Sequence, residues 1–195
     1  MKYIYLDCDD VLLDTTQIFM DFMRENYGIV NDINKYPSEW DISTSPFADF
    51  GAAVEAFARS DYYQNIPPRP QAKDGIKALQ ALGCKLFVVS SCPNDTTSEQ
   101  HRRCCLNRHF GDVFEDIACL SFSFDNKGKY FISVPKGIVV DDSIFNINKA
   151  LQYGHEGILI AIKQNGKFQR EAKAKNIIIS HNLLEVADFL KSHNN

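Results

Sequence analysis

The residues best suited to chemistry are three aspartates that lie within four positions near the start of the chain. Asp7, Asp9 and Asp10 directly follow residues 2–6, an apolar run that is rich in β-forming side chains and long enough for one strand. Neighbouring carboxylates disfavour one another's ionisation and resist desolvation, so fold stability gives no reason to gather them there. The pattern predicts a site that receives a cation, and the plain alternative is an acidic surface turn after a short strand.

Two later apolar segments also end on polar side chains. The predicted strand 85–89 stops at Ser90 and Ser91, and a short strand near residue 140 stops at Asp141 and Asp142. In an open parallel sheet, the carboxyl ends of the strands lie on one edge, where ligands bind. We therefore expect four carboxylates and a pair of hydroxyls to converge in one crevice.

A polar loop predicted over residues 125–129 precedes the last of these strands and contributes Lys127 and Lys129. An all-oxygen set of carboxylates suits Mg²⁺, which shares its coordination shell with substrate phosphates. A hydroxyl and a lysine opposite the acids would supply a hydrogen-bond donor and a positive charge for the anion. The combination predicts phosphoryl transfer by positioning and electrostatics.

The elements that must position these residues follow a regular alternation of helix and strand. This alternation predicts an α/β fold, with a doubly wound, mostly parallel sheet and helices on both faces. The predicted helices cover residues 14–27, 52–58, 72–82, 96–110, 143–152 and 183–192, and the predicted strands cover residues 2–6, 85–89, 116–122, 137–140, 157–162 and 176–180.

A small helical cap is predicted as an insertion after the first strand. It spans residues 15–66, and residues 1–14 and 67–195 form the catalytic core. Most of its aromatic side chains are expected to form the core of the cap. Trp40 and Tyr63 are our first choices for stacking a nucleobase, if the ligand carries one.

The order and spacing of these motifs resemble those of the haloacid dehalogenase superfamily along the whole chain. The insertion resembles the superfamily's C1-type helical cap. The matching pieces are Asp7-Cys8-Asp9-Asp10-Val11 for the first motif, Ser90 or Ser91 for the second, Lys127 or Lys129 for the third and Val139-Val140-Asp141-Asp142 for the fourth.

This resemblance implies roles for the residues. Asp7 would be the nucleophile that forms an aspartyl phosphate, and Asp9 would act first as general acid and then as base, which requires a raised pKa. Mg²⁺ would be held by Asp7, the backbone carbonyl of Asp9, and either Asp141 or Asp142. The serine and the lysine would bind the phosphoryl oxygens.

A narrower similarity links the chain to the 5′(3′)-deoxyribonucleotidases. It rests on Val11-Leu12-Leu13-Asp14, the pair Tyr62-Tyr63, His109-Phe110-Gly111 and the two acids of the fourth motif. It implies a nucleoside monophosphate as substrate. The alternatives are a phosphatase for a phosphosugar or another small phosphoester, and a catalytically idle binding or regulatory module. Asp10 departs from the nucleotidase pattern, where Gly is usual, and an outward-pointing carboxylate is the simplest interpretation.

Composition limits the partners of the chain. With 195 residues, a net charge of −4 and a pI of about 5.7, it has no basic field for a nucleic acid polymer. No apolar run reaches membrane-spanning length, and six scattered cysteines are typical of free thiols in a reducing compartment. We expect a cytoplasmic monomer or homodimer that acts on a small phosphorylated metabolite. Arg102 and Arg103 are expected on a solvated helix face.

Overall fold

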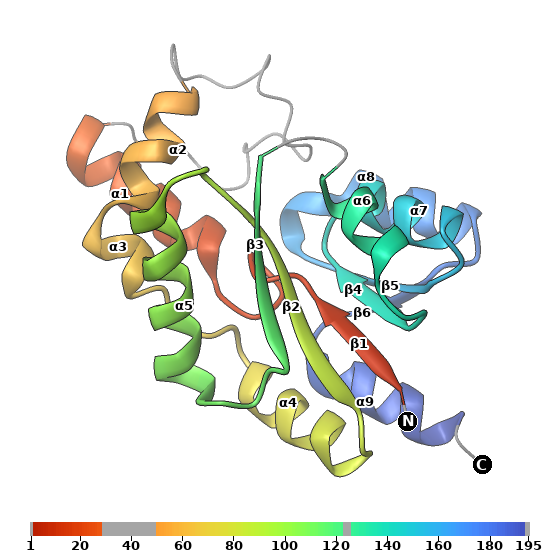
Figure 1. The fold of residues 1–195 in the computed structure, drawn as a ribbon. Coiled ribbons are helices and arrows are strands. Elements are labelled where there is room, and N and C mark those ends of the chain that lie inside the picture. Colours follow the sequence, from red (N-terminus) through yellow and green to blue (C-terminus); the bar gives the residue numbers. More distant parts are fainter. Residues whose placement is uncertain (1, 29–49, 123–125, 194–195) are drawn as a thin grey trace.

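The fold is built on one parallel six-stranded sheet, seen in a computed structural model that describes residues 2–28, 50–122 and 126–193 (Figure 1). The strand order is β3-β2-β1-β4-β5-β6, and every neighbouring pair is parallel. The strands are β1 (Tyr3–Leu6), β2 (Lys85–Cys92), β3 (Asp116–Ser121), β4 (Ile138–Asp141), β5 (Glu156–Ile160) and β6 (Ile178–Ser180). The predicted doubly wound α/β fold is confirmed.

Helices cover both faces of the sheet. The described helices are α1 (Thr15–Tyr27), α2 (Phe50–Ala58), α3 (Asp61–Gln64), α4 (Ala72–Ala81), α5 (Thr96–Phe110), α6 (Asn126–Ser133), α7 (Ile144–Gln152), α8 (Gly166–Ala174), α9 (Leu183–Ser192) and the 3₁₀ turn η3 (Lys163–Asn165). Buried side chains of α4, α5 and α9 pack on one face, and those of α6, α7 and α8 pack on the other. Figure 1 shows α6, α7 and α8 together on one side of the sheet.

The three central strands are in parallel register, and β2 extends beyond the ends of β1 and β4. Leu6 of β1 pairs with Val88 of β2 and with Val140 of β4, and the Asp7 backbone N–H donates to the Val140 carbonyl at 2.9 Å. Neighbouring parallel strands therefore bring the residues that follow these pairs to one edge. The predicted convergence of the strand ends follows from this register.

Side chains alternate between the two faces along each strand. Tyr5, Val89 and Val139 belong to the buried cluster under α6–α8, whereas Leu6 and Val88 belong to the cluster under α4, α5 and α9. Two residues beyond Tyr5 and Val139, the same alternation places Asp7 and Asp141 on the face covered by α6, α7 and α8.

Two local predictions were wrong. The strand predicted over 85–89 continues as β2 to Cys92, because its polar end still pairs with β3. Of the loop predicted over 125–129, residues 126–129 are instead the first turn of α6, whose inner side buries Lys127 and Phe131. A helix with one buried aromatic and one buried lysine has too weak an apolar pattern for detection. The same reason explains α8, for which there was no prediction and which buries only Phe168 and Ala172.

The helices α1, α2 and α3 share an aromatic core. Phe57 of α2 lies 5.1 Å from Phe19 and 5.4 Å from Phe22, measured between ring centroids, and 5.4 Å from Tyr63 of α3. The expectation that the cap aromatics are mainly core is confirmed for these residues. The division into a core and a cap over 15–66 stays a prediction.

The described part of the chain contains no helix that is both long and apolar enough to cross a membrane. All six cysteines lie in that part, and each is a free thiol, as predicted.

Candidate active site

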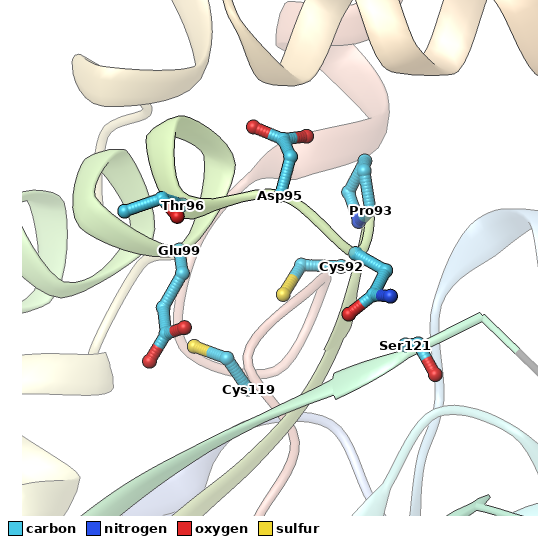
Figure 2. Close-up of a pocket in the computed structure, with 8 residues that line it drawn as sticks. Cys92, Pro93, Asp95, Thr96, Glu99, Cys119 and Ser121 are labelled. Atoms are coloured by element: carbon cyan, nitrogen blue, oxygen red, sulfur yellow. The ribbon is translucent and has the colours of Figure 1, made fainter.

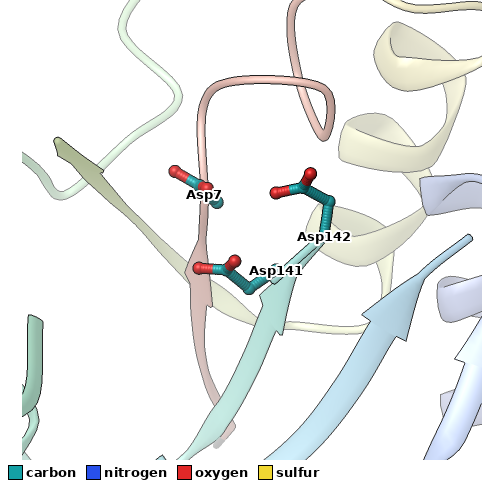
Figure 3. Close-up of side chains that lie close together, drawn as sticks. All are labelled: Asp7, Asp141 and Asp142. Carbon is teal, nitrogen blue, oxygen red and sulfur yellow. The ribbon is translucent and has the colours of Figure 1, made fainter. Parts of the chain in front are cut away.

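Three buried carboxylates lie close together where β1 and β4 end (Figure 3). One oxygen from each of Asp7, Asp141 and Asp142 lies within 4.8 Å of the others. Burial, followed by the nearby Asp141 charge, raises the pKa of Asp7 to about 7 and the pKa of Asp142 well above its ordinary value. The cluster is therefore frustrated as it stands, and a divalent cation would relieve it.

Lys127 is the cation that the structure brings to this cluster. Its Nζ donates to Asp7 Oδ1 and to Asp141 Oδ2, both at 2.9 Å. Burial opposes the charge on Lys127, but the carboxylates of Asp141 and Asp7 outweigh that effect and raise its pKa. Lys129 is exposed on α6. Of the two lysines predicted for the site, the structure places Lys127 in the cluster and leaves Lys129 outside it.

The two acids of the fourth motif differ in their hydrogen bonds. Asp141 accepts from the Ser143 backbone N–H at 2.8 Å and from Asn146 Nδ2 at 3.0 Å to each oxygen. The Asp142 carboxylate accepts no hydrogen bond from the described residues, although its backbone carbonyl accepts from Asn165 Nδ2 at 2.8 Å. Asp142 therefore has the carboxylate oxygens that are free for a metal ion.

Asn146 and Asn165 were not predicted as site residues. Asn146 follows Asp141 by five positions on α7, and Asn165 lies beyond β5, at the end of η3. The buried Asn165 amide also donates to the Ile160 carbonyl at 2.9 Å and accepts from the Ile162 N–H at 3.0 Å. Its sole sequence signal is a polar residue just after an apolar strand, which is common in loops.

The two serines of the second motif face opposite sides of the sheet. The alternation along β2 places Ser91 on the face of Asp7 and Asp141, and Ser90 on the face of Cys8. Ser90 is fully buried, and its hydroxyl has no hydrogen-bond partner among the described residues. Ser91 is partly exposed. The strand geometry therefore favours Ser91 over Ser90 as the serine near the carboxylates.

Among the described residues, the hydrogen-bond partners of the Asp9 carboxylate are Thr15 and Arg102, and neither of them forms a hydrogen bond with Asp7, Asp141 or Asp142. Its Oδ1 accepts from Thr15 Oγ1 at 2.6 Å, and Arg102 Nη2 donates to Oδ1 at 2.7 Å and to Oδ2 at 2.9 Å. The prediction of a solvated face was wrong for Arg102, which is 1% exposed, because this side of α5 packs against the first motif and α3. Arg103 does lie at the surface, where it pairs with Glu99 at 2.8 Å.

Asp10 points inward rather than outward. It is buried, and its carboxylate accepts hydrogen bonds from the backbone N–H and the hydroxyl of Thr16, at the start of α1. Burial raises its pKa to about 6. Its φ of 54° lies in the left-handed region, which agrees with the usual Gly at this position in the nucleotidases. Asp10 contacts the start of α1 and is not a member of the cluster of Asp7, Asp141 and Asp142.

The structure describes one of the two aromatic residues predicted to stack on a base, Tyr63. Tyr63 is buried, and the guanidinium of Arg102 covers its ring at 4.3 Å from the centroid. It is therefore a packing residue and not an open stacking platform. Trp40 lies outside the described residues.

A cavity of about 170 Å³ lies beside the site, where β2 and β3 end and α5 begins (Figure 2). Within it, Cys92 donates a hydrogen bond to Cys119, which raises the pKa of Cys92 and lowers that of Cys119. The lining residues are Cys92, Pro93, Asn94, Asp95, Thr96, Glu99, Cys119 and Ser121. The clustered carboxylates are not among them, so the cavity is separate from the cluster.

Comparison with known proteins identifies the fold. No protein-family model and no curated protein matches the chain. A haloacid dehalogenase-like hydrolase from Streptococcus pneumoniae superposes with a TM-score of 0.67 at 16% identity, over 97% of this chain and 98% of that one. The chain has a haloacid dehalogenase-like fold.

Other solved structures with this fold differ in their chemistry. The D,D-heptose 1,7-bisphosphate phosphatase from B. bronchiseptica, complexed with magnesium and phosphate, gives a TM-score of 0.60 at 16% identity over 99% of both chains. The L-2-haloacid dehalogenase from Xanthobacter autotrophicus, with chloropropionic acid covalently bound, gives 0.60 at 12% identity over 98% of both chains. At these identities the haloacid dehalogenase-like fold is shared, and the activity must be argued from the residues.

Proposed function

We propose that the protein is a Mg²⁺-dependent phosphomonoester hydrolase that works through an aspartyl phosphate on Asp7. The observation that supports this most is the cluster of Asp7, Asp141 and Asp142, in which the Asp142 carboxylate has no hydrogen-bond donor among the described residues. Lys127 lies beside the same carboxylates and offers a positive charge to a phosphoryl group. A phosphatase with the same fold, complexed with magnesium and phosphate, is consistent with this proposal.

The donor set fits magnesium. Asp7 and Asp142 offer carboxylate oxygens, and the backbone carbonyl of Asp9 is the third ligand implied by the resemblance. Bound there, Mg²⁺ would neutralise charge on the phosphoryl oxygens. Asp141 is already engaged by Lys127 and Asn146, so its role is to hold that lysine in place.

In the first step, an Asp7 carboxylate oxygen attacks phosphorus and the bond to the ester oxygen breaks. Asp7 Oδ1 is held by the Cys8 backbone N–H and Lys127, whereas Oδ2 accepts no hydrogen bond from the described residues and is free to attack. Asp9 takes up a proton when the substrate binds and gives that proton to the departing alkoxide. Lys127 and Ser91 hold the phosphoryl oxygens.

In the second step, water attacks the aspartyl phosphate. Asp9 now takes the proton from water, the bond between Asp7 and phosphorus breaks, and inorganic phosphate leaves. Both carboxyl groups return to the protonation states that they have when the substrate is bound, so the cycle is balanced for one ester and one water.

Within this class, nucleoside monophosphates remain our first choice of substrate from the sequence resemblance. The burial of Tyr63 removes one of the two contacts proposed for a base. The similarity to a heptose bisphosphate phosphatase favours a sugar phosphate as the second candidate. A panel of deoxynucleoside monophosphates and sugar phosphates, compared by kcat/KM with Mg²⁺ present, separates the two.

The experiment that tests the function uses the purified protein, Mg²⁺ or a chelator, and the variants Asp7→Asn and Lys129→Met. We expect phosphate release that needs Mg²⁺, is lost in Asp7→Asn and is retained in Lys129→Met, because Lys129 is exposed. Undiminished release by Asp7→Asn would contradict the proposal. Absence of turnover on every phosphoester would favour the idle module, and halide release from 2-chloropropionate would favour a dehalogenase.

The cytoplasmic location and the monomeric or homodimeric state stay predictions from the sequence.

A further inference from the structure

A buried arginine joins the first motif to α3. Arg102 of α5 is 1% exposed, and its guanidinium lies over the Tyr63 ring at 4.3 Å. The guanidinium also makes three hydrogen bonds: Nη2 donates to both carboxylate oxygens of Asp9, at 2.7 and 2.9 Å, and Nη1 donates to Cys8 Sγ at 3.0 Å. Its Nε is buried and has no hydrogen-bond partner in the part of the chain that the structure describes. A charge in such surroundings is stabilised chiefly by its ion pair, so Asp9 is the counter-ion of Arg102.

The contact between α5 and α3 is fixed by several hydrogen bonds beyond this arginine. The Ile66 carbonyl, just after α3, accepts from His109 Nε2 at 2.9 Å and from Cys105 Sγ at 3.3 Å. Arg108 donates to the Gln64 carbonyl at 3.1 Å. These bonds hold α3 against α5, so the Tyr63 ring stays over the guanidinium.

The orientation of the Asp9 carboxylate is therefore set from two sides. Thr15, the first residue of α1, donates to Oδ1, and Arg102 contacts both oxygens. Thr15 and Tyr63 lie near the two ends of the predicted cap, 15–66. The packing of both cap ends thus determines where the proton-carrying group of the proposed reaction lies.

We propose that Arg102 is a positioning residue that couples the packing of Tyr63 to the orientation of Asp9, and this inference rests on the proposed function. An acid must lie within hydrogen-bond reach of the leaving oxygen, and a displacement of about 1 Å can lower a rate about a hundredfold. A change that lets the Asp9 carboxyl move therefore slows chiefly the hydrolysis of substrates whose leaving oxygen needs a proton. An alkyl phosphate is such a substrate, and p-nitrophenyl phosphate is not.

The first test asks whether the ion pair exists, independently of activity. Urea-unfolding midpoints are measured for Asp9→Asn, Arg102→Met and the double variant, with Arg103→Met as the matched control from the next position of α5. We expect each of the first two changes to lower the midpoint, and the double variant to lose much less than the sum. Additive losses would overturn the proposal, whatever the enzyme hydrolyses.

The second test asks whether the pair positions Asp9 for the reaction. In Arg102→Met we expect kcat for glycerol phosphate to fall at least about tenfold more than kcat for p-nitrophenyl phosphate, since general acid catalysis contributes about 10²–10⁴-fold. We expect KM to stay within about threefold, because Arg102 does not touch the phosphoryl site. Arg103→Met should keep the wild-type ratio of the two kcat values. If Arg102→Met does not fold, Tyr63→Leu, which retains the ion pair but removes the ring, should shift the ratio in the same direction.

Equal losses on both substrates, or no loss, would overturn the positioning role while leaving the phosphatase proposal intact. A wild-type protein that hydrolyses neither substrate, nor any other phosphoester, would instead overturn the proposed function and this role with it. The two failures are therefore distinguishable from the same set of proteins.

Discussion

Replacing Asp7 with Asn is expected to stabilise the metal-free protein near pH 8 while it abolishes turnover. Burial and the Asp141 charge raise the pKa of Asp7 from 3.8 to about 7. Since one pKa unit is worth about 1.4 kcal/mol, the ionised Asp7 lowers the free energy of unfolding by up to about 4 kcal/mol at pH 8. Asn keeps an oxygen for the Cys8 N–H and Lys127 but carries no charge.

The sign of the pH dependence follows from a raised carboxyl pKa. The stabilisation from protonated Asp7 is fully present below the unfolded-state pKa, near 3.8, and is lost as the pH rises through about 7. Wild type should therefore lose stability between about pH 4 and pH 8, and Asp7→Asn should lose less. At pH 4 the two proteins should differ by less than about 1 kcal/mol.

The assay is thermal unfolding in chelator and in Mg²⁺. In chelator at pH 8, Asp7→Asn should have a Tm at least about 5 °C above wild type, since 1 kcal/mol corresponds to about 2–4 °C in a chain of this size. Mg²⁺ at a hundred times its Kd should add about 2.7 kcal/mol to wild type and much less to the variant. A variant that is less stable than wild type in chelator at pH 8, or that gains as much from Mg²⁺, would refute this reasoning.

Four further changes, with one control variant, test single residues of the site. Lys127→Met should remove turnover and lower the urea-derived free energy of unfolding by about 3–5 kcal/mol, because it leaves two buried carboxylates unpaired, whereas Lys129→Met should change neither. Ser91→Ala should lower kcat for p-nitrophenyl phosphate about a hundredfold, the usual effect of losing one donor to a developing charge. Ser90→Ala removes a buried hydroxyl that no described residue hydrogen-bonds, and it should leave stability unchanged or raise it by about 1 kcal/mol. The raised pKa of Asp10, about 6, makes the wild type less stable as the pH rises from 4 to 7. Asp10→Asn should therefore lose less stability than the wild type over this range, as measured by urea-unfolding midpoints.

Each of these predictions has a clear contrary result. Equal effects of the two lysine changes would mean that the ion pairs at the site contribute nothing measurable. Loss of activity in the Ser90 variant rather than the Ser91 variant would mean that the strand alternation does not decide which hydroxyl meets phosphate. An unchanged pH profile in the Asp10 variant would mean that this carboxylate is not the group that titrates.

The sequence predicted which strand ends meet, because that depends on a general rule. Apolar strands alternating with helices form a parallel sheet, and the carboxyl ends of such strands share an edge. Asp7 and Asp141 could be placed together on that basis alone, and the structure brings one oxygen of each within 4.8 Å. The identity of the neighbouring lysine depended instead on the phase of α6, which turns Lys127 inward and leaves Lys129 exposed.

The partners of the individual side chains could not be predicted from the sequence. The choice between Ser90 and Ser91 needs the register of β2 against β1, because one step along a strand reverses the face. The burial of Arg102 needs a partner 93 positions away in the chain, and a charged residue on a polar helix otherwise indicates a solvated face. Local pattern is informative about elements, and long-range pairing decides which polar side chains are buried.

The central claim is that Asp7 becomes covalently phosphorylated. Wild-type protein is mixed with p-nitrophenyl phosphate and Mg²⁺, quenched in acid within one turnover and mapped by peptide mass spectrometry. The account predicts that the peptide containing Asp7 gains the mass of one phosphoryl group and that the Asp7→Asn protein shows no such gain. Rapid phosphate release without any phosphorylated peptide, or a phosphoryl group on another residue, would contradict it.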